Sequence, residues 1–553
     1  MTDHIPTTQR AVVFTGPDQI EIDPAKPLPP LGPTQLLLRM EACGICFSDT
    51  KLLHAFSQHP RKSQAVGGLT PAELATVAGY APGDRPVTPG HEPVARIVAV
   101  GDQVRRHQVG ERVAIQTDYR HLPTAASNVS FGYTIDGGLA EYTILDERVV
   151  IEPETGERFL IPVSERPSAS AIALAEPWAC VEASYAWGER RTPVQGGSLL
   201  VVADAGAQVE GLDELLAQAQ PARQVTVGLP GSDPTTQALD SVDQVTGQFD
   251  DIVYFGSDPD LVEALGPRLA SGGLMNLVTG GASFGRPVQI DVGRVHYDLI
   301  RYTGSTGHRP QPGYDAVPAS CDLGPGDRVA VIGAAGPMGL MHAVRAITLG
   351  VPDVSLDAVD VNDERLAHLE QVLAPLAART GAKARVWNST SQPLPEQAYD
   401  YVALMVPAGP LVAQAIAWAG PGSVVNAFAG FAVGTMAGLD LDAIVERHVY
   451  LVGTSGSRIV DVATVVGRIE DGVVDTNISL DAISGLDGVP AAIASVIDRT
   501  SQGKIVVYPA LGDMGLIRLV DLPQRLPEVA AAMVDGQWTK QAEEVLLRTV
   551  PAL

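Results

Sequence analysis

The chain is short of cysteine, of aromatic residues and of positive charge. It has 4 cysteines among 553 residues, 5% aromatic residues and a net charge of −26. So few cysteines exclude the dense disulfide framework of small secreted proteins, and we expect a reduced, cytoplasmic protein whose thiols remain available as ligands. The acidic balance argues against nucleic acid and anionic membrane surfaces as partners, because phosphate binding requires clustered Lys and Arg.

Long hydrophobic runs are missing as well. No continuous apolar stretch reaches the roughly 18 residues of a transmembrane helix, and the start, "MTDHIPTTQRAVVF", lacks the basic segment and apolar core of a signal peptide. The composition, 45% hydrophobic and 18% charged, is that of globular proteins. The length exceeds what one hydrophobic core supports and suggests about three or four domains.

Two kinds of pattern divide the chain. Residues 8–150 contain short alternating strands such as "RAVVFTG" and "ARIVAVG" with Gly and Pro between them, which predicts a β-rich, barrel-like domain. The long stretch between Asp49 and Gly90 predicts a surface excursion with one short helix. From Ser198 onward, strands and helices alternate, which is typical of a parallel sheet covered by helices.

The strand–helix part occurs twice. "SLLVVADAGAQVEGL" matches "RVAVIGAAGPMGL", "DDIVYFGSDPDLVEAL" matches "YDYVALMVPAGPLVAQAI", and two further segments match in the same order. We interpret this as an internal duplication. The expected domains are 1–195 completed by 503–553, then 196–320, then 321–502.

The second copy contains a candidate dinucleotide loop between a strand and a helix. Its residues are Gly333, Gly336, Pro337, Met338 and Gly339. Glycines there allow a tight turn, close approach of the pyrophosphate and close helix packing. Asp360 follows Gly339 by 21 residues at the end of the next strand, where a carboxylate binds ribose hydroxyls and favours NAD over NADP. The alternative is a structural turn with an incidental Asp.

The first copy has lost these features. It keeps Gly206 and Gly211 but places Asp204 and Glu210 where a pyrophosphate would be repelled. We predict that it keeps the fold without binding a dinucleotide, and serves as a spacer, a substrate wall or an interface.

A candidate metal set lies in the β-rich part and just after it. Its members are Cys46, His91, Glu92, Glu176 and Cys180. Cys, His and a third Cys or Glu suit Zn²⁺, and three protein ligands leave a fourth position open, as catalysis requires. A redox pair formed by Cys43 and Cys46 is the weaker interpretation, because no thioredoxin-like βαβ unit surrounds it.

Five motifs, "GICFSD", "PGHEPVARIVAVG", "VGERVA", "DGGLAEYT" and "GAAGPMG", together resemble the zinc-dependent medium-chain dehydrogenase family, which includes alcohol and sorbitol dehydrogenases. The resemblance covers residues 8 to about 200 and about 322 to 545. It implies an α/β fold: a GroES-like β-rich catalytic domain and Rossmann-like doubly wound domains, here two in tandem with the first degenerate.

Carried over to this chain, the resemblance implies specific roles. Cys46 and His91 would bind zinc, with Glu92 as an exchangeable ligand or a neighbour of the ligands. The third ligand would be Glu176, as in sorbitol-type members, which we favour slightly over Cys180, as in alcohol-type members. Ser48 would relay the substrate proton and Asp49 would orient the ligand histidine. Cys43 and Cys321 are predicted to be buried packing residues.

The chain also departs from the family pattern. The closely spaced cysteines of a structural zinc are absent, so we expect one metal ion. Lys51 replaces the family's relay histidine, and it either contacts an anionic group such as a sugar phosphate or is simply solvated.

The function expected from these features is hydride transfer between NAD(H) and a secondary alcohol or ketone, in a polyol, cyclitol or sugar phosphate. The alternatives are an epimerase or eliminase that oxidises its substrate transiently, and a non-catalytic NAD-binding sensor or interaction protein. The resemblance also implies a homodimer or homotetramer, assembled through a terminal sheet strand.

Overall fold

The structure, a computed structural model, describes residues 5–229, 236–392 and 398–550. It divides the chain into two compact units, Met1–Glu182 with Gly456–Leu553, and Ala183–Ser455. Residues 456–502 therefore pack with the first unit, whereas the sequence-based domain boundaries, which remain a prediction, group them with the second strand–helix copy. Among the described residues, none of the helices combines the length and apolar character needed to cross a lipid bilayer.

The first unit is built on a mixed sheet whose two middle strands adjoin the candidate metal residues. Its strands, in spatial order, are β26 (Ile517–Arg518), β24 (Leu480–Ser484), β25 (Lys504–Val507), β3 (Gln35–Ile45), β4 (Glu92–Val100), β5 (Arg112–Ile115) and β9 (Leu160–Pro162), with β8 (Tyr142–Asp146) also paired to β3. Two hairpins join β1 (Thr8–Gly16) to β2 (Gln19–Pro27) and β6 (Asp118–Pro123) to β7 (Asn128–Ser130). Apolar side chains of β3 and β4 form its core.

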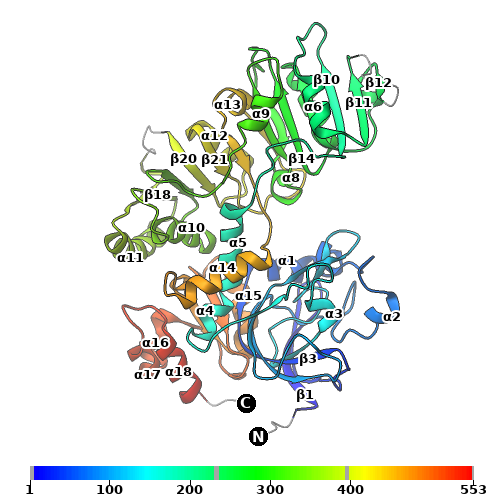
Figure 1. Cartoon of the computed structure of the whole chain (residues 1–553). Helices are drawn as coiled ribbons and strands as arrows, with labels where there is room; N and C mark the ends of the chain where they lie inside the picture. The colour runs from blue at the N-terminus through cyan, green and yellow to red at the C-terminus, as the bar shows by residue number, and fades with distance from the viewer. Residues whose placement is uncertain (1–4, 230–235, 393–397, 551–553) are drawn as a thin grey trace. The chain divides into compact units, whose positions relative to one another are not determined.

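The helices of this unit are short. They are α1 (Phe47–Ala55), α2 (Pro71–Leu74), α3 (Glu147–Val150), α4 (Ala169–Ala173), the start of α5 (Ala175–Ala186), α14 (Ile459–Glu470), α15 (Val489–Ile497), α16 (Leu522–Arg525), α17 (Pro527–Ala531) and α18 (Lys540–Thr549) (Figure 1).

The stretch between Asp49 and Gly90 holds one short α-helix after α1, as predicted, but its expected position at the surface is wrong around Lys62. This side chain is 0% exposed. Its ammonium donates hydrogen bonds to the carbonyls of Ala81 and Arg85 and lies over the ring of Phe56. Three such contacts offset the burial of the charge, so this segment is part of the packed domain.

The second unit contains two parallel sheets of the same topology. The first has the order β12 (Gln237–Leu239), β11 (Arg223–Val227), β10 (Ser198–Ala203), β13 (Phe249–Phe255), β14 (Leu269–Val278) and β16 (Arg301–Ser305). The second has the order β19 (Lys383–Asn388), β18 (Ser355–Asp360), β17 (Arg328–Ile332), β20 (Tyr399–Leu404), β21 (Ala419–Asn426) and β23 (Tyr450–Val452). Both follow the 3-2-1-4-5-6 order of the Rossmann fold, which confirms the predicted fold class.

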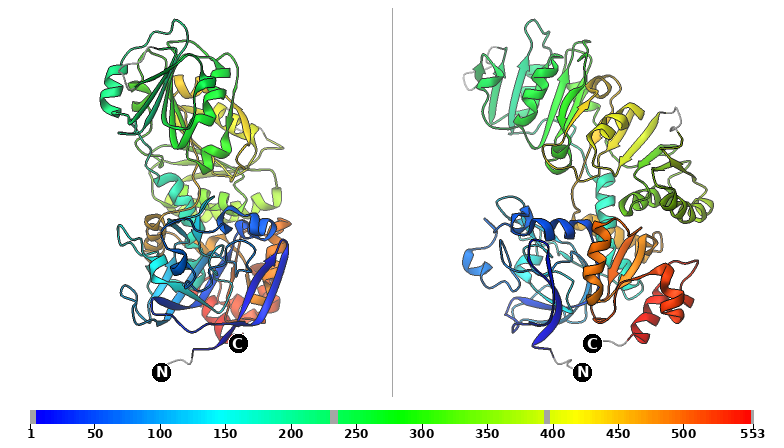
Figure 2. Two further views of the ribbon diagram at one scale, coloured as in Figure 1. Left: turned by 90° about the vertical axis from the view of Figure 1, so that its right-hand side faces the viewer. Right: turned by 180° about the vertical axis from the view of Figure 1, so that it is seen from behind.

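Helices cover both sheets, and they correspond after β10 and β17, after β13 and β20, and after β14 and β21. Those of the first copy are α6 (Leu212–Ala219), α7 (Pro259–Leu265), α8 (Val292–Tyr297) and α9 (Gln311–Asp315); those of the second are α10 (Pro337–Thr348), α11 (Asp363–Thr380), α12 (Gly409–Trp418) and α13 (Leu441–Glu446) (Figure 1). A small two-stranded sheet joins β15 (Val288–Asp291) of the first copy to β22 (Met436–Leu439) of the second. Figure 2 shows this unit from two further sides.

Candidate functional site

Two neighbouring strands bring the candidate metal residues together. Cys46 follows the last residue of β3, and His91 immediately precedes Glu92, the first residue of β4. These strands pair antiparallel with Gly44 opposite Glu92, so the end of one strand meets the start of the other. Residues that lie 45 positions apart in the sequence thereby converge.

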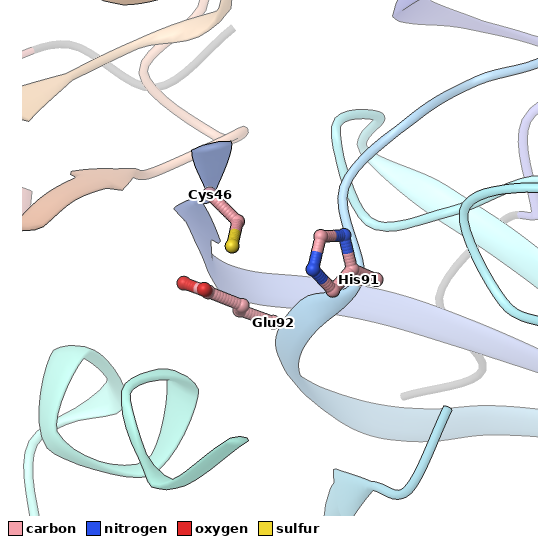
Figure 3. Close-up of side chains that lie close together, drawn as sticks. All are labelled: Cys46, His91 and Glu92. Carbon is pink, nitrogen blue, oxygen red and sulfur yellow. The ribbon is translucent and has the colours of Figure 1, made fainter. Parts of the chain in front are cut away.

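Three side chains form the one group with metal-ligand geometry among the residues that the structure describes: Cys46, His91 and Glu92, whose ligand atoms all lie within 4.8 Å of one another. Figure 3 shows the three side chains close together at the adjoining ends of the two strands. The Oε2 atom of Glu92 is buried and has no hydrogen-bond partner among the residues that the structure describes. A thiol, an imidazole and an otherwise unpaired carboxylate oxygen form a donor set that fits Zn²⁺.

Asp49 and Ser48 connect these groups. The Asp49 Oδ1 atom lies 3.1 Å from Nδ1 of His91, and Oδ2 accepts a hydrogen bond from the Cys46 backbone N–H at 2.9 Å. Burial alone would raise the pKa of Asp49, but the charge of His91 and these hydrogen bonds hold it below its usual value. The Ser48 hydroxyl donates to the Cys46 sulfur at 2.9 Å and lies 3.2 Å from Nε2 of His91.

Lys504 is a member of this site that the sequence reasoning missed. It begins β25, which pairs with β3, and it is 5% exposed. Its ammonium donates to Glu92 Oε1 at 2.5 Å and to the Ile45 carbonyl at 2.8 Å. Its signal in the sequence is a single charge at the start of the apolar run "KIVVY", which indicates a buried charge with a partner.

The two candidates for the third ligand both lie on α5. The Cys180 thiol donates to Glu176 Oε1 at 3.5 Å, and neither residue belongs to the group of three. Burial raises the pKa of the Glu176 carboxyl to about 7, with His91 and Glu92 acting in opposite directions. Both candidates are thus electrostatically coupled to the group, and the choice between them stays a prediction.

The other cysteines and Lys51 lie outside the group. Cys43 and Cys321 are buried, in agreement with their predicted packing roles. Lys51 is exposed, and its ammonium lies 5.6 Å from the ring centroid of Phe47.

Aromatic and basic side chains surround His91. The Tyr133 ring lies 5.2 Å from the ring of His91 and 5.2 Å from that of His59. The guanidinium of Arg61 covers the same tyrosine ring at 5.1 Å and pairs with Asp118 at 3.2 Å. His59 and Arg61 come from the stretch that was predicted to be a surface excursion, so this stretch contributes to the surroundings of the metal group.

The glycine loop of the second copy has the shape that a dinucleotide requires. Gly333 has φ +81°, and a Cβ atom at Gly339 would lie 2.2 Å from the Gly333 carbonyl oxygen. α10 then begins at Pro337, followed by Met338. Asp360 ends β18, and its carboxylate accepts a hydrogen bond from the Ala335 N–H at 3.0 Å. The loop and the carboxylate are therefore adjacent, as in dinucleotide-binding folds.

The corresponding turn of the first copy is filled by its own side chains. The hydroxyl of Tyr254 lies 2.8 and 2.9 Å from the two carboxylate oxygens of Asp204, and the Ser257 N–H also donates to this carboxylate. A Cβ atom at Gly256 would lie 2.1 Å from Asp204 Oδ2. Asp204 thus has a structural role in the turn.

Comparison with known proteins agrees with this architecture. Residues 32–154 match the family model of the alcohol dehydrogenase GroES-like domain. "Alcohol dehydrogenase notN" of an Aspergillus species is 32% identical over 155 residues, which is 26% of this chain and 38% of that protein. "Uncharacterized protein YggP" of Escherichia coli is 25% identical over 374 residues, which is 59% of this chain and 80% of that protein.

A solved structure extends the likeness in fold to most of the chain. The crystal structure of 2R,3R-butanediol dehydrogenase from Bacillus subtilis matches with a TM-score of 0.51 and 16% identity, over 91% of this chain and 100% of that one. The GroES-like match, the related dehydrogenases and the Rossmann-type sheets agree with the resemblance drawn from the five motifs. Residues 32–154 are thus an alcohol dehydrogenase GroES-like domain, and the rest of the chain is similar in fold to zinc-type medium-chain dehydrogenases.

Proposed function

We propose that this protein is a zinc- and NAD-dependent dehydrogenase that oxidises a secondary alcohol, a polyol, cyclitol or sugar phosphate, to the ketone and catalyses the reverse reduction. The observation that carries the proposal is the convergence of Cys46, His91 and Glu92 within 4.8 Å in a chain that also has an intact glycine loop. A reducing cytoplasmic location would keep the Cys46 thiol available.

Cys46 and His91 would hold the metal, with Glu92 and either Glu176 or Cys180 completing the set. When bound, Zn²⁺ polarises an alcohol or carbonyl oxygen and lowers the pKa of the alcohol, and the nicotinamide exchanges the hydride with the carbinol carbon. Asp49 fixes the orientation of His91 through the 3.1 Å contact with Nδ1, so that Nε2 faces the Cys46 side. The Ser48 hydroxyl, between the sulfur and this nitrogen, is placed to pass a proton.

The glycine loop 333–339 would bind the pyrophosphate at the start of α10, where backbone N–H groups favour an anion. The Asp360 carboxylate would accept the hydroxyls of the adenosine ribose and repel a 2′-phosphate. This arrangement supports NAD rather than NADP as the cofactor.

Basic residues near His91 support a substrate that carries an anionic group. Arg61 is 24% exposed, and the described part of the chain offers its guanidinium one hydrogen-bond acceptor, Asp118. Against the effect of burial, the charges of Arg61 and Arg120 both lower the pKa of Asp118, so two arginines lie close to one carboxylate. The remaining N–H donors of Arg61 suit a phosphate or a carboxylate.

The test is a panel of polyols, cyclitols and their phosphates with NAD⁺ and NADP⁺, followed by NADH absorbance, together with metal analysis. We expect one zinc per chain and NAD-dependent turnover. Cys46→Ala should remove both, whereas Cys321→Ala, a matched change in the other unit, should retain both. Full activity of Cys46→Ala would contradict the proposal. Substrate conversion without NADH accumulation would indicate transient oxidation, and NAD binding without turnover on any substrate would indicate a sensor.

A further inference from the structure

The two Rossmann-like copies contact each other through their corresponding edges. β16 and β23 are each the last strand in their sheet, and these two strands are in contact. One continuous hydrophobic core contains buried residues of both copies, among them Leu277 and Tyr302 of the first and Val425 and Leu451 of the second.

The pairing of β15 with β22 has the pattern of a two-fold symmetric interface. The strands occupy equivalent places, since each precedes a short helix, α8 or α13, that is capped by an Asp side chain. They run antiparallel, and Val288 pairs with Leu439 while Asp291 pairs with Met436. The first residue of each strand thus faces the last residue of the other. Reciprocal pairing of this kind defines an isologous contact between two copies of one surface.

A second pair of contacts repeats the same reciprocity. Gly304 in β16 faces α13, because a Cβ atom there would lie 2.7 Å from Val445 Cγ2. Gly453, the equivalent residue after β23, faces α8, because a Cβ atom there would lie 2.9 Å from the Cα atom of His296. Neither position has room for a side chain, so the two copies are packed as closely as a domain interior.

Polar groups also join the copies, one of them buried. Arg301 of β16 is 3% exposed, and its guanidinium donates to the Gly453 carbonyl at 3.0 Å. The Asp442 carboxylate of the second copy accepts hydrogen bonds from the Ser283 hydroxyl and the Phe284 N–H of the first. The buried guanidinium of Arg301, whose charge is paired with Glu189 at 3.0 Å, thus reaches across the contact, and the Asp442 bonds join the copies at its exposed rim.

We propose that residues 196–320 act as a built-in partner subunit, which occupies the face of the cofactor-binding copy that a second copy of this chain would otherwise cover. The degenerate copy supplies one half of an isologous interface and holds no cofactor, because Asp204 fills its turn. The terminal strands that the sequence offered for homodimer formation are consequently both buried within one chain.

A cross-linking experiment tests this assignment without reference to activity. Gln289 and Gly438 are direct partners in the antiparallel β15–β22 pair, and opposite residues of such a pair have Cα atoms about 4.5–5.5 Å apart, within the separation that a disulfide between Gln289→Cys and Gly438→Cys can span. The double variant is oxidised mildly, digested without reduction and analysed by mass spectrometry. Equal amounts of ¹⁴N- and ¹⁵N-labelled protein are unfolded and refolded together before oxidation.

We expect 289–438 disulfide peptides that contain only one isotope, in chains that migrate at 58.0 kDa on a non-reducing gel. Neither single variant can form the 289–438 peptide, so each serves as the background control. Mixed-isotope peptides in a band of twice the mass would show that the contact forms between chains and would overturn the proposal. Absence of any 289–438 peptide under strong oxidation would also count against the proposal, since opposite residues of an antiparallel pair lie within the Cα separation that a disulfide spans.

Discussion

Replacing Lys504 with Met should destabilise the metal-free first unit strongly. Lys504 provides the hydrogen bond to Glu92 Oε1, while Oε2 has no partner in the described part of the chain and Glu92 is 0% exposed. The variant therefore leaves a fully buried carboxylate without a counter-charge. Removal of one partner from a buried ion pair costs about 3–5 kcal/mol, which is a factor of about 10² to 10⁴ in the unfolding equilibrium.

The assay is guanidinium unfolding of EDTA-treated protein, followed by hydrogen exchange of peptides from β3 and β25, because these peptides report on the first unit alone. The double variant Lys504→Met/Glu92→Gln removes both charges and should recover most of the loss, since an ion pair and its neutral replacement differ little in stability. Lys383→Met changes an exposed lysine at the start of β19 and should shift stability by less than about 0.5 kcal/mol.

Zinc should partly restore the stability of the Lys504→Met variant, because a bound cation at Cys46 and His91 gives the Glu92 carboxylate a new counter-charge. The midpoint of unfolding should therefore rise more on zinc addition in this variant than in the unaltered protein. A loss below about 1 kcal/mol for Lys504→Met without metal would refute the reasoning, since it would mean that Glu92 does not depend on Lys504.

Four further changes test other parts of the molecule. Arg61→Gln should raise KM for a phosphorylated polyol about 10- to 150-fold, which corresponds to the loss of a charged hydrogen bond of about 1.5–3 kcal/mol. KM for the unphosphorylated polyol should change by less than about threefold. Equal effects on the two KM values would contradict an anionic substrate. Ser48→Ala should keep its zinc but lose about 10²- to 10⁴-fold in kcat, with recovery in Ser48→Thr; unchanged kcat would exclude the proton relay. Asp360→Ser should lower the ratio of kcat/KM for NAD⁺ over NADP⁺ at least about tenfold, and a constant ratio would exclude its role in selection. Burial lowers the pKa of His342 to about 3, so between about pH 6.5 and 3 only the unfolded chain binds a proton at this residue. The free energy of unfolding therefore decreases as the pH is lowered, by about 2 kcal/mol from pH 8 to pH 5. Guanidinium unfolding at both pH values should show a smaller decrease in His342→Gln, and an equal decrease would contradict this.

The sequence predicted the parts of the site whose residues are neighbours in short motifs. Cys46, Ser48 and Asp49 lie within four positions, and the His91–Glu92 pair lies at the start of a recognisable strand. The contact between Lys504 and Glu92 spans 412 positions and depends on β25 pairing with β3, which no local pattern specifies. Arg61 was missed because a polar stretch between two motifs is typical of a surface loop.

The fold class was predictable because strand–helix alternation and the order of the four repeated segments specify two Rossmann-type sheets. The contact between these two sheets was not predictable from the sequence. Antiparallel pairing of β15 and β22 joins two strands of four residues each, and short apolar runs carry too little periodicity to identify their partners.

The close contact of the two copies also bears on how they could diverge. In a symmetric homodimer every substitution appears in both halves, so a change that ruins a cofactor turn ruins both turns at once. When the halves are encoded separately within one polypeptide, an acidic residue such as Asp204 can become fixed in one half while the glycine loop 333–339 persists in the other. Selection can then refine the first half for cohesion alone and leave the second half to retain the chemistry.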